Sequence, residues 1–168
     1  MWWVCFFVTV AVASNDILVL ERQLNASECQ SIVQQAGNQP RIVISKDPTW
    51  SQWDKRLFDV FGNALLAYNG FIGHPLGANQ DSGYVLIQRN TTHDSVAPFC
   101  EYKAVYAVLF LNGDVAGGQW YFPRQKETFE PECGRLLMFP DTFTHPRAVR
   151  DVRLGTSWVI VTSFKSRS

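Results

Sequence analysis

Apolar residues recur at spacings of three and four along the second quarter of the chain. From Trp50 through Leu57 to Tyr68 they would share one face of a helix, and a face of this kind packs against a sheet. Gly70 and the glycines that follow it are expected to end the helix. The pattern therefore predicts one long amphipathic helix whose apolar stripe belongs to the core.

A short strand and a second helix are predicted upstream of it. Residues 17–20 are a short apolar run typical of a strand, and residues 41–45 form another. Between them, Asn25 can cap a helix that runs to about Ala36, with Glu28 bonding back to the capping backbone. Asn25 also opens a glycosylation sequon, and we expect the cap and a glycan to compete for one side-chain amide.

Beyond residue 77 the pattern changes to strands alone. Turn residues such as those at 112–114 and 117–118 separate them. The predicted strands are residues 84–88, 104–111, 119–122, 136–139 and 158–161. Because helices come first and strands follow without alternation, a parallel sheet is disfavoured. The chain of 168 residues suits one α+β domain that ends in a β-sandwich or jelly roll.

The first thirteen residues form an apolar run that is too short to span about 30 Å of hydrocarbon as a helix. Ala11-Val12-Ala13 supplies the small residues of a signal-peptidase site, so we expect a signal peptide over residues 1–13 and a domain over residues 14–168. No Lys or Arg precedes the run, and the alternative is a buried amino-terminal strand. No later segment predicts a membrane span. The expected location is the endoplasmic reticulum lumen or the extracellular space.

This compartment changes the interpretation of the cysteines. Cys29, Cys100 and Cys133 remain after cleavage, so one disulfide and one free or intermolecular thiol are expected, and the pairing stays open. A second sequon begins at Asn90. Lys plus Arg and Asp plus Glu balance at 15 each, which leaves no strong field to hold nucleic acid. We therefore expect no nucleic-acid partner.

Five fragments of the sequence follow one another in a specific order. They are Leu24–Cys29, Phe110–Asn112, Gly117–Pro123, Pro131–Phe139, and His145 with the later Gly155–Trp158. This order resembles the collagen prolyl hydroxylases, which belong to the 2-oxoglutarate/Fe(II) dioxygenases. The resemblance implies amino-terminal helices packed on a double-stranded β-helix, or jelly roll. It also implies Fe(II), 2-oxoglutarate and ascorbate as cofactors, and a protein or peptide substrate.

The same resemblance implies a metal site of two histidines and one carboxylate, which leaves open positions on Fe(II). His145 matches the distal histidine and His93 the proximal one. The family carries His-x-Asp, whereas this chain places Ser95 at the carboxylate position and an aspartate, Asp94, one residue early. Because successive side chains of a strand point to opposite faces, Asp94 would face away from the metal unless a bulge re-aims it.

A second departure concerns the cation that binds the far carboxylate of 2-oxoglutarate. The family places Lys or Arg two residues after the glycine of its last strand, and this chain has Ser157 there. A buried carboxylate needs a cation or several hydrogen-bond donors. Lys103, Arg147 and Arg153 are the candidate replacements, and Lys103 is favoured because some oxygenases of this fold use a lysine on a neighbouring strand.

Three functions stay open at this point. The first is a prolyl hydroxylase-like dioxygenase of the secretory pathway, active or catalytically impaired. The second is a noncatalytic pseudoenzyme, in which the strand at residues 120–122 contacts a secreted protein or peptide. The third is an unrelated secreted jelly-roll lectin or cupin, which leaves the order of the fragments unexplained.

Overall fold

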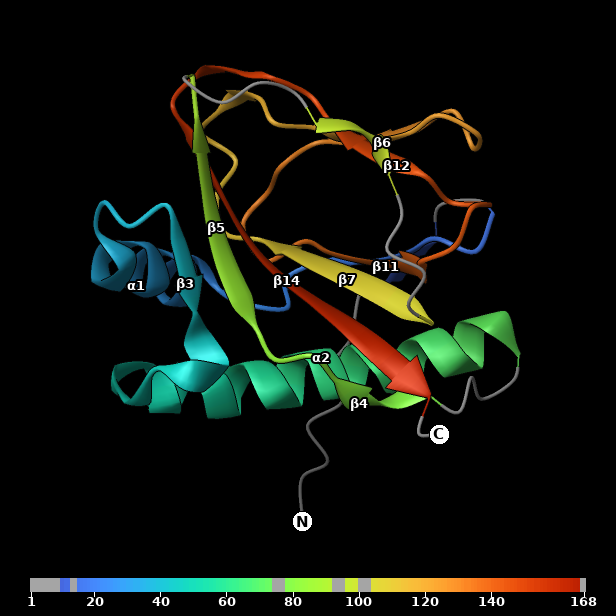
Figure 1. Cartoon of the computed structure of the whole chain (residues 1–168), viewed down its shortest axis with the longest axis horizontal. Helices are drawn as coiled ribbons and strands as arrows, with labels where there is room; N and C mark the ends of the chain where they lie inside the picture. The colour runs from blue at the N-terminus through green and yellow to red at the C-terminus, as the bar shows by residue number, and fades with distance from the viewer. Residues whose placement is uncertain (1–9, 13–14, 74–77, 92–95, 100–103, 167–168) are drawn as a thin grey trace.

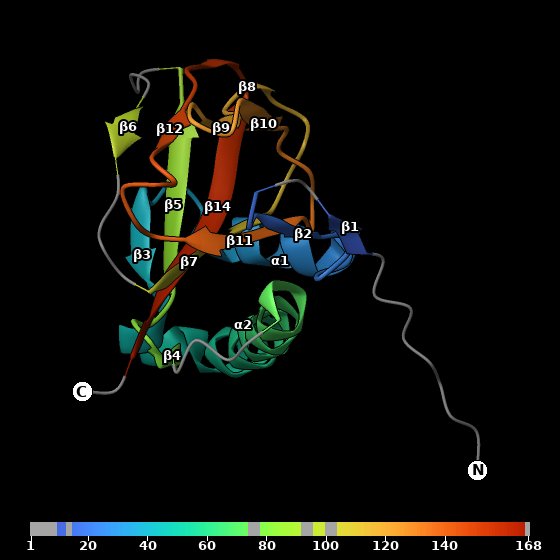
Figure 2. The same ribbon diagram turned by 90° about the vertical axis from the view of Figure 1, so that its right-hand side faces the viewer.

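The computed structural model describes residues 10–12, 15–73, 78–91, 96–99 and 104–166. The helices α1 (Ala26–Ala36) and α2 (Ser51–Ile72) cover one face of an eight-stranded sheet. A four-stranded sheet faces its other side, so the chain forms three layers (Figures 1 and 2). This arrangement confirms the predicted α+β jelly roll with helices packed on it.

Every strand pair of the described residues is antiparallel. The large sheet has the order β1-β2-β11-β7-β14-β5-β3, with β4 also paired to β14. Its strands are β1 (Val10–Val12), β2 (Leu18–Leu20), β3 (Arg41–Val43), β4 (Ala78–Asp81), β5 (Val85–Asn90), β7 (Val105–Phe110), β11 (Leu136–Pro140) and β14 (Thr156–Ser166).

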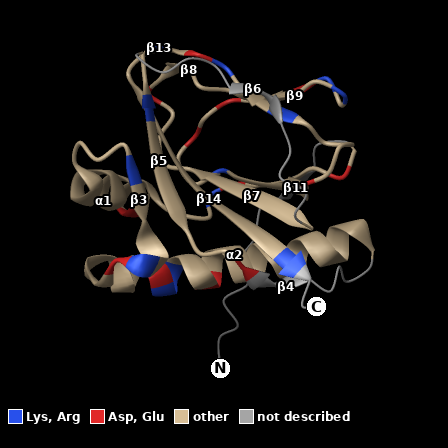
Figure 3. Ribbon diagram, in the orientation of Figure 1, with Lys and Arg blue, Asp and Glu red and all other residues tan. Residues whose placement is uncertain are grey.

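The smaller sheet has the order β10-β9-β12-β6, and a third sheet pairs β13 with β8. These strands are β6 (Val96–Phe99), β8 (Ala116–Gly117), β9 (Trp120–Phe122), β10 (Glu127–Phe129), β12 (Arg147–Val149) and β13 (Val152–Leu154). Charged residues lie mainly on α2 and around the smaller sheet, whereas β7 has none (Figure 3). The centre of the large sheet is therefore apolar on both faces.

Strand β7 divides the core into two clusters. Val105, Ala107 and Leu109 face the helices, while Tyr106 and Val108 face the smaller sheet. All six residues of β7 are buried. A strand covered on both faces shows no polar alternation in its sequence, which explains the continuous apolar run.

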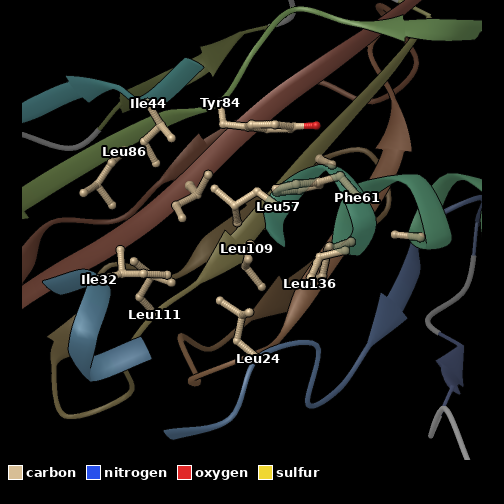
Figure 4. Packing of buried hydrophobic residues seen from close by; sticks show 14 of the residues in the cluster. Leu24, Ile32, Ile44, Leu57, Phe61, Tyr84, Leu86, Leu109, Leu111 and Leu136 are labelled. Atoms are coloured by element: carbon tan, nitrogen blue, oxygen red, sulfur yellow. The ribbon is translucent and has the colours of Figure 1, made fainter. Parts of the chain in front are cut away.

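The helix-side cluster contains the apolar stripe of α2. Leu57 and Phe61 point toward Leu109 and Leu136 of the large sheet (Figure 4). The Phe61 ring stacks on Tyr84 with 5.3 Å between ring centroids. The prediction that this stripe is core is confirmed.

The cluster between the sheets is rich in aromatic residues. Trp120 and Phe122 of β9 are buried, and Phe122 meets Phe139 with 4.7 Å between ring centroids. The expectation that the strand at residues 120–122 contacts a partner is therefore wrong for these two core residues. Tyr121 is half-buried and points the other way, with the guanidinium of Arg150 at 4.6 Å from its ring centroid.

Two predicted boundaries differ from the structure. Helix α2 passes Gly70 and ends at Ile72, because Gly73 adopts the left-handed conformation (φ 80°) that closes it. Strand β3 ends at Val43, and Ser45 lies in a 3₁₀ helix (Ile44–Lys46) instead of the strand. The Ser45 hydroxyl donates to Asp54 (2.7 Å) of α2 and accepts from the backbone N–H of Tyr84 (2.9 Å), so it joins helix to sheet.

The amino-terminal cap of α1 forms as predicted. The Asn25 Oδ1 accepts from the backbone N–H of Glu28 at 2.8 Å, and Glu28 Oε2 accepts from the backbone N–H of Asn25 at 2.9 Å. This reciprocal pair satisfies two donors that the first turn of a helix leaves open.

The edge of the large sheet includes part of the predicted signal peptide. Val10 pairs with Leu20 and Val12 with Leu18, so β1 covers the outer side of β2. A short strand thus forms over Val10–Val12, while a signal peptide over residues 1–13 and processing near Ser14 stay predictions. Among the described residues, no helix is long and apolar enough to cross a membrane.

The structure pairs Cys29 of α1 with Cys133, which precedes β11. The two cysteines are 104 positions apart, and Cys100 lies outside the described residues. The sequence left this pairing open. The bond fixes the first helix to the loop that enters the sheet.

Replacing both partners, as Cys29→Ser with Cys133→Ser, should lower the free energy of unfolding by about 2–4 kcal/mol, because a long loop regains freedom in the unfolded chain. Urea unfolding without reductant measures the difference. Cys100→Ser leaves the Cys29–Cys133 bond in place, so it is the matched control and should lower the free energy of unfolding by less. Equal destabilisation by both changes would contradict this role of the bond.

Candidate functional site

The structure describes four of the eight candidate site residues. His145 lies in the loop between β11 and β12, Arg147 on β12, Arg153 on β13 and Ser157 on β14. The other four, His93, Asp94, Ser95 and Lys103, lie outside the described residues. The roles of all eight stay predictions.

His145 uses both of its ring nitrogens. Its side chain is buried, with Nε2 at 2.7 Å from the backbone oxygen of Asn15 and Nδ1 at 2.8 Å from the hydroxyl of Thr144. Because a carbonyl oxygen only accepts, Nε2 must carry the proton and donate. In the neutral ring Nδ1 then accepts from Thr144. Neither nitrogen offers a lone pair to a metal while these bonds hold.

These bonds give His145 a structural task. Asn15 and Asp16 both have φ near +64°, a conformation that costs energy in residues other than glycine. His145 holds the carbonyl of Asn15, and the Tyr68 hydroxyl donates to the carbonyl of Asp16 at 2.9 Å. Together they fix the turn that leads into β2.

Ser157 is buried on the face of β14 that looks toward the smaller sheet, in line with Val159 and Val161. A Cβ added to Gly118 would lie 3.3 Å from the Ser157 side chain. The antiparallel register sets Arg89 of β5 directly opposite Ser157. Because directly opposed residues share a face, Arg89 also faces the space between the sheets.

Arg89 is a cation that the sequence analysis did not consider. It is half-buried, and desolvation lowers the pKa of its guanidinium, while Tyr106 acts in the opposite direction. Within the described ranges no carboxylate forms an ion pair with it. Only the register of β5 against β14 reveals that this arginine and Ser157 are neighbours, since no motif joins them in sequence.

Arg153 lies away from this face. It is exposed, whereas the preceding Val152 is buried. It borders an open cavity of about 390 Å³ whose other lining residues are Gln119, Thr128, Arg150 and Asp151. Among the described residues, no hydrogen bond or ion pair joins Arg153 to Ser157 or His145.

A buried ion pair lies between the sheets. Arg147 of β12 and Asp141 have no exposed side-chain surface, and Nη1 of Arg147 lies 2.6 Å from Oδ1 of Asp141. The guanidinium also lies 3.8 Å from the ring centroid of Tyr106 and 5.4 Å from that of Phe139. Arg147 was a candidate for binding the cosubstrate, and the structure gives its charge a protein partner.

Comparison with known proteins begins from sequence. No protein-family model matches the chain. A segment of 72 residues is 32% identical to Prolyl 3-hydroxylase 1 of Gallus gallus, which is 40% of this chain and 10% of that protein. The match thus spans a small part of its relative.

Solved structures give a likeness over almost the whole chain. The viral collagen prolyl hydroxylase of Paramecium bursaria Chlorella virus-1 superposes with a TM-score of 0.72 and 11% identity, over 92% of this chain and 91% of that one. A Trichoplax adhaerens prolyl hydroxylase, solved with a peptide fragment of hypoxia-inducible factor, gives 0.71 and 14%, over 91% and 84%. The chain has the fold of the prolyl hydroxylases. A Pseudomonas putida prolyl-4-hydroxylase agrees, with a TM-score of 0.66, 14% identity and coverage of 92% and 95%.

Several residues that suggested the prolyl hydroxylases have structural reasons to be where they are. Gly117 (φ 91°) and Gly134 (φ 80°) leave no room for a Cβ, which would meet the backbone oxygens of Asp151 and Leu24. The Asn112 side chain donates to the Thr156 oxygen (2.7 Å) and accepts from a backbone N–H of β14 (3.0 Å). These residues therefore have roles in backbone geometry and hydrogen bonding in this chain.

The described part of the site does not fit the Fe(II) that the prolyl hydroxylase family implies. Iron of this kind needs imidazole nitrogens and a carboxylate on one side. His145 has both nitrogens bonded to protein atoms, and in the described ranges no three His, Cys, Asp or Glu side chains form a group that could hold a metal. Among the described residues, the fully buried charged pair of this prolyl hydroxylase fold is an arginine and an aspartate.

The Arg147–Asp141 pair gives a prediction for stability. Asp141→Asn should cost about 3–5 kcal/mol of unfolding free energy, because it takes the carboxylate from a fully buried cation. Glu132→Gln is the matched control: its side chain pairs with Arg135 but is 62% exposed, and the loss should stay below about 1 kcal/mol. Urea unfolding compares the two, and similar losses would show that burial does not set the strength of the inner pair.

Proposed function

We propose that this chain is a prolyl hydroxylase-like domain of the secretory pathway that binds a protein or peptide without turning over 2-oxoglutarate. The observation that carries the proposal is the bonding of His145. An iron ligand must present a free lone pair. In this imidazole Nε2 donates its proton to the carbonyl of Asn15, and the lone pair of Nδ1 accepts from the hydroxyl of Thr144. Releasing the Nε2 bond would also free the carbonyl of Asn15 in the turn before β2.

The charges between the sheets support the same proposal. The Arg147 guanidinium pairs with Asp141 through Nη1 and packs on the Tyr106 ring, so part of its charge is already offset within the protein. Ser157 offers a neutral hydroxyl at the position where the family carries its cation. Loss of a ligand and of a cation affects the same cosubstrate, so the two losses should compound.

A peptide ligand is supported by the fold. The Trichoplax adhaerens neighbour was solved with a peptide fragment of hypoxia-inducible factor. The jelly roll can retain a peptide-binding surface without retaining chemistry, since a fold does not fix a function. We propose a protein or peptide as the ligand of this chain as well.

One observation favours an active dioxygenase as the second candidate. Arg89 faces the space between the sheets directly opposite Ser157 and lacks a carboxylate among the described residues. A guanidinium there is suited to hold the far carboxylate of 2-oxoglutarate. In that case His93 and Asp94 would have to complete the metal site.

Succinate release with Fe(II), 2-oxoglutarate and ascorbate separates the two candidates. We expect no release above the protein-free background, under conditions where the Pseudomonas putida prolyl-4-hydroxylase turns over. Robust release by the unmodified chain would show that the noncatalytic proposal is wrong.

His145→Ala should lower the melting temperature. His145→Gln should lower it less, because an amide can still donate to the carbonyl of Asn15. Neither change should alter Fe(II) affinity.

The binding half of the proposal has its own measurement. A fluorescent peptide of Pro-Pro-Gly repeats should bind saturably, with equal affinity in the presence and absence of Fe(II) and 2-oxoglutarate. A Gly-Ser repeat of the same length is the control and should not bind. Failure of the proline peptide to bind would contradict proline-rich peptides as ligands.

Expression in a secretory host tests the proposed compartment. The secreted protein should begin near Ser14, because the peptidase site at Ala11-Val12-Ala13 precedes it. Cleavage there removes β1 and leaves β2 at the sheet edge, with Asn15 still held by His145. Mass spectrometry of the intact protein reads the terminus. Material that begins at Met1, or stays in the cytosol, would contradict the proposal.

A further inference from the structure

The two polar atoms of the Asn25 side chain differ in their hydrogen bonding: Oδ1 is bonded to the backbone of α1, and Nδ2 is not bonded to any described residue. Its Oδ1 accepts the backbone N–H of Glu28 at 2.8 Å and so caps α1. Its Nδ2 donates to no atom of the described residues, and Asn25 is exposed. The carboxylate of Glu28 does not compete for Nδ2, since it accepts from the backbone N–H of Asn25 and from Arg56 at 2.8 Å.

Asn25-Ala26-Ser27 is a sequon, and the atom that a sequon offers for modification is Nδ2. We propose that Asn25 carries an N-linked glycan and caps α1 at the same time. The inference rests on the proposed passage through the secretory pathway. It goes beyond the proposed function, because nothing in the binding or metal chemistry requires a glycan.

The chemistry leaves the cap intact. In the transfer, Nδ2 bonds to the anomeric carbon of a lipid-linked oligosaccharide, the lipid pyrophosphate leaves, and Nδ2 loses one proton. The product is a secondary amide whose Oδ1 keeps its lone pairs and remains a hydrogen-bond acceptor. The sequence alone suggested that cap and glycan exclude each other. The structure removes this conflict, because the two roles use different atoms.

The other sequon stands in different surroundings. Asn90 is half-buried, ends strand β5 and lies opposite Thr156 of β14. A bulky glycan on Nδ2 there would start from a side chain that is partly covered, at a position paired with β14. At Asn25 the neighbouring residues Ala26 and Ser27 are exposed as well, so a glycan extends directly into solvent. We therefore assign the glycan to Asn25 and not to Asn90.

The test is the mobility shift of secreted protein on treatment with an N-glycan-cleaving amidase. Residues 1–13 are replaced by a proven heterologous signal peptide, so that delivery to the lumen does not depend on the native leader. The parent should show one glycan step. Ser27→Ala and Asn25→Asp should each abolish it, whereas Ser27→Thr and Thr92→Ala should retain it. A parent without the step, or a step that survives Ser27→Ala, would overturn the proposal.

Thermal unfolding of the same variants distinguishes the effect of the glycan on the melting temperature from that of the helix cap. Ser27→Ala keeps the Asn25 cap and Asn25→Asp keeps an acceptor oxygen, so both should melt close to the enzymatically deglycosylated parent. Asn25→Ala loses both roles and should melt lower than either. If Asn25→Ala has the same melting temperature as Ser27→Ala and Asn25→Asp, then Oδ1 does not cap the helix as the proposal requires.

A parallel arm with the native residues 1–13 separates this inference from the proposed function. A glycan step with the heterologous leader but not with the native one would leave Asn25 as a competent site and overturn the proposed compartment. No step with either leader would overturn the assignment of Asn25 itself.

Discussion

Strand β7 has no exposed residue, and much of the fold follows from the need to cover both of its faces. Val105, Ala107 and Leu109 require the helices, and the residues that alternate with them require the smaller sheet. Burying all six side chains of one short strand supplies a large hydrophobic gain, and detachment of either outer layer loses the part that belongs to the face it covers. The layers are therefore coupled through one strand.

The same constraint shapes the polar chemistry between the sheets. A charge that enters this apolar layer must bring a counter-charge with it, because isolated buried ions are costly. Arg147 and Asp141 meet that demand by pairing, and the Arg147 guanidinium also lies over the rings of Tyr106 and Phe139. In this chain the positive charge buried between the sheets is balanced by the carboxylate of another protein side chain.

Local patterns in the sequence were sufficient for the helices, the central strands and the cap at Asn25, because each depends on residues a few positions apart. The bond of His145 to Asn15, the position of Arg89 opposite Ser157, and the pairing of Cys29 with Cys133 join residues far apart in the chain. They depend on strand register and loop path, which composition and periodicity do not encode. The site was therefore harder to predict than the fold. The recognisable motif residues did not help, because Gly117 is explained by a close approach of the backbone and Asn112 by its hydrogen bond to the backbone of β14.

The disulfide has a consequence for synthesis. Of the three cysteines beyond residue 13, Cys29 leaves the ribosome first, Cys100 next, and Cys133 only after most of the chain is made. In the oxidising compartment that we propose, Cys29 and Cys100 are thus both exposed to oxidation before the native partner of Cys29 exists. A Cys29–Cys100 bond formed at that stage would have to be exchanged before Cys133 could pair with Cys29, by attack of a thiolate on the existing disulfide. Under the proposed location, the order of the cysteines along the chain would therefore link maturation of this domain to thiol exchange.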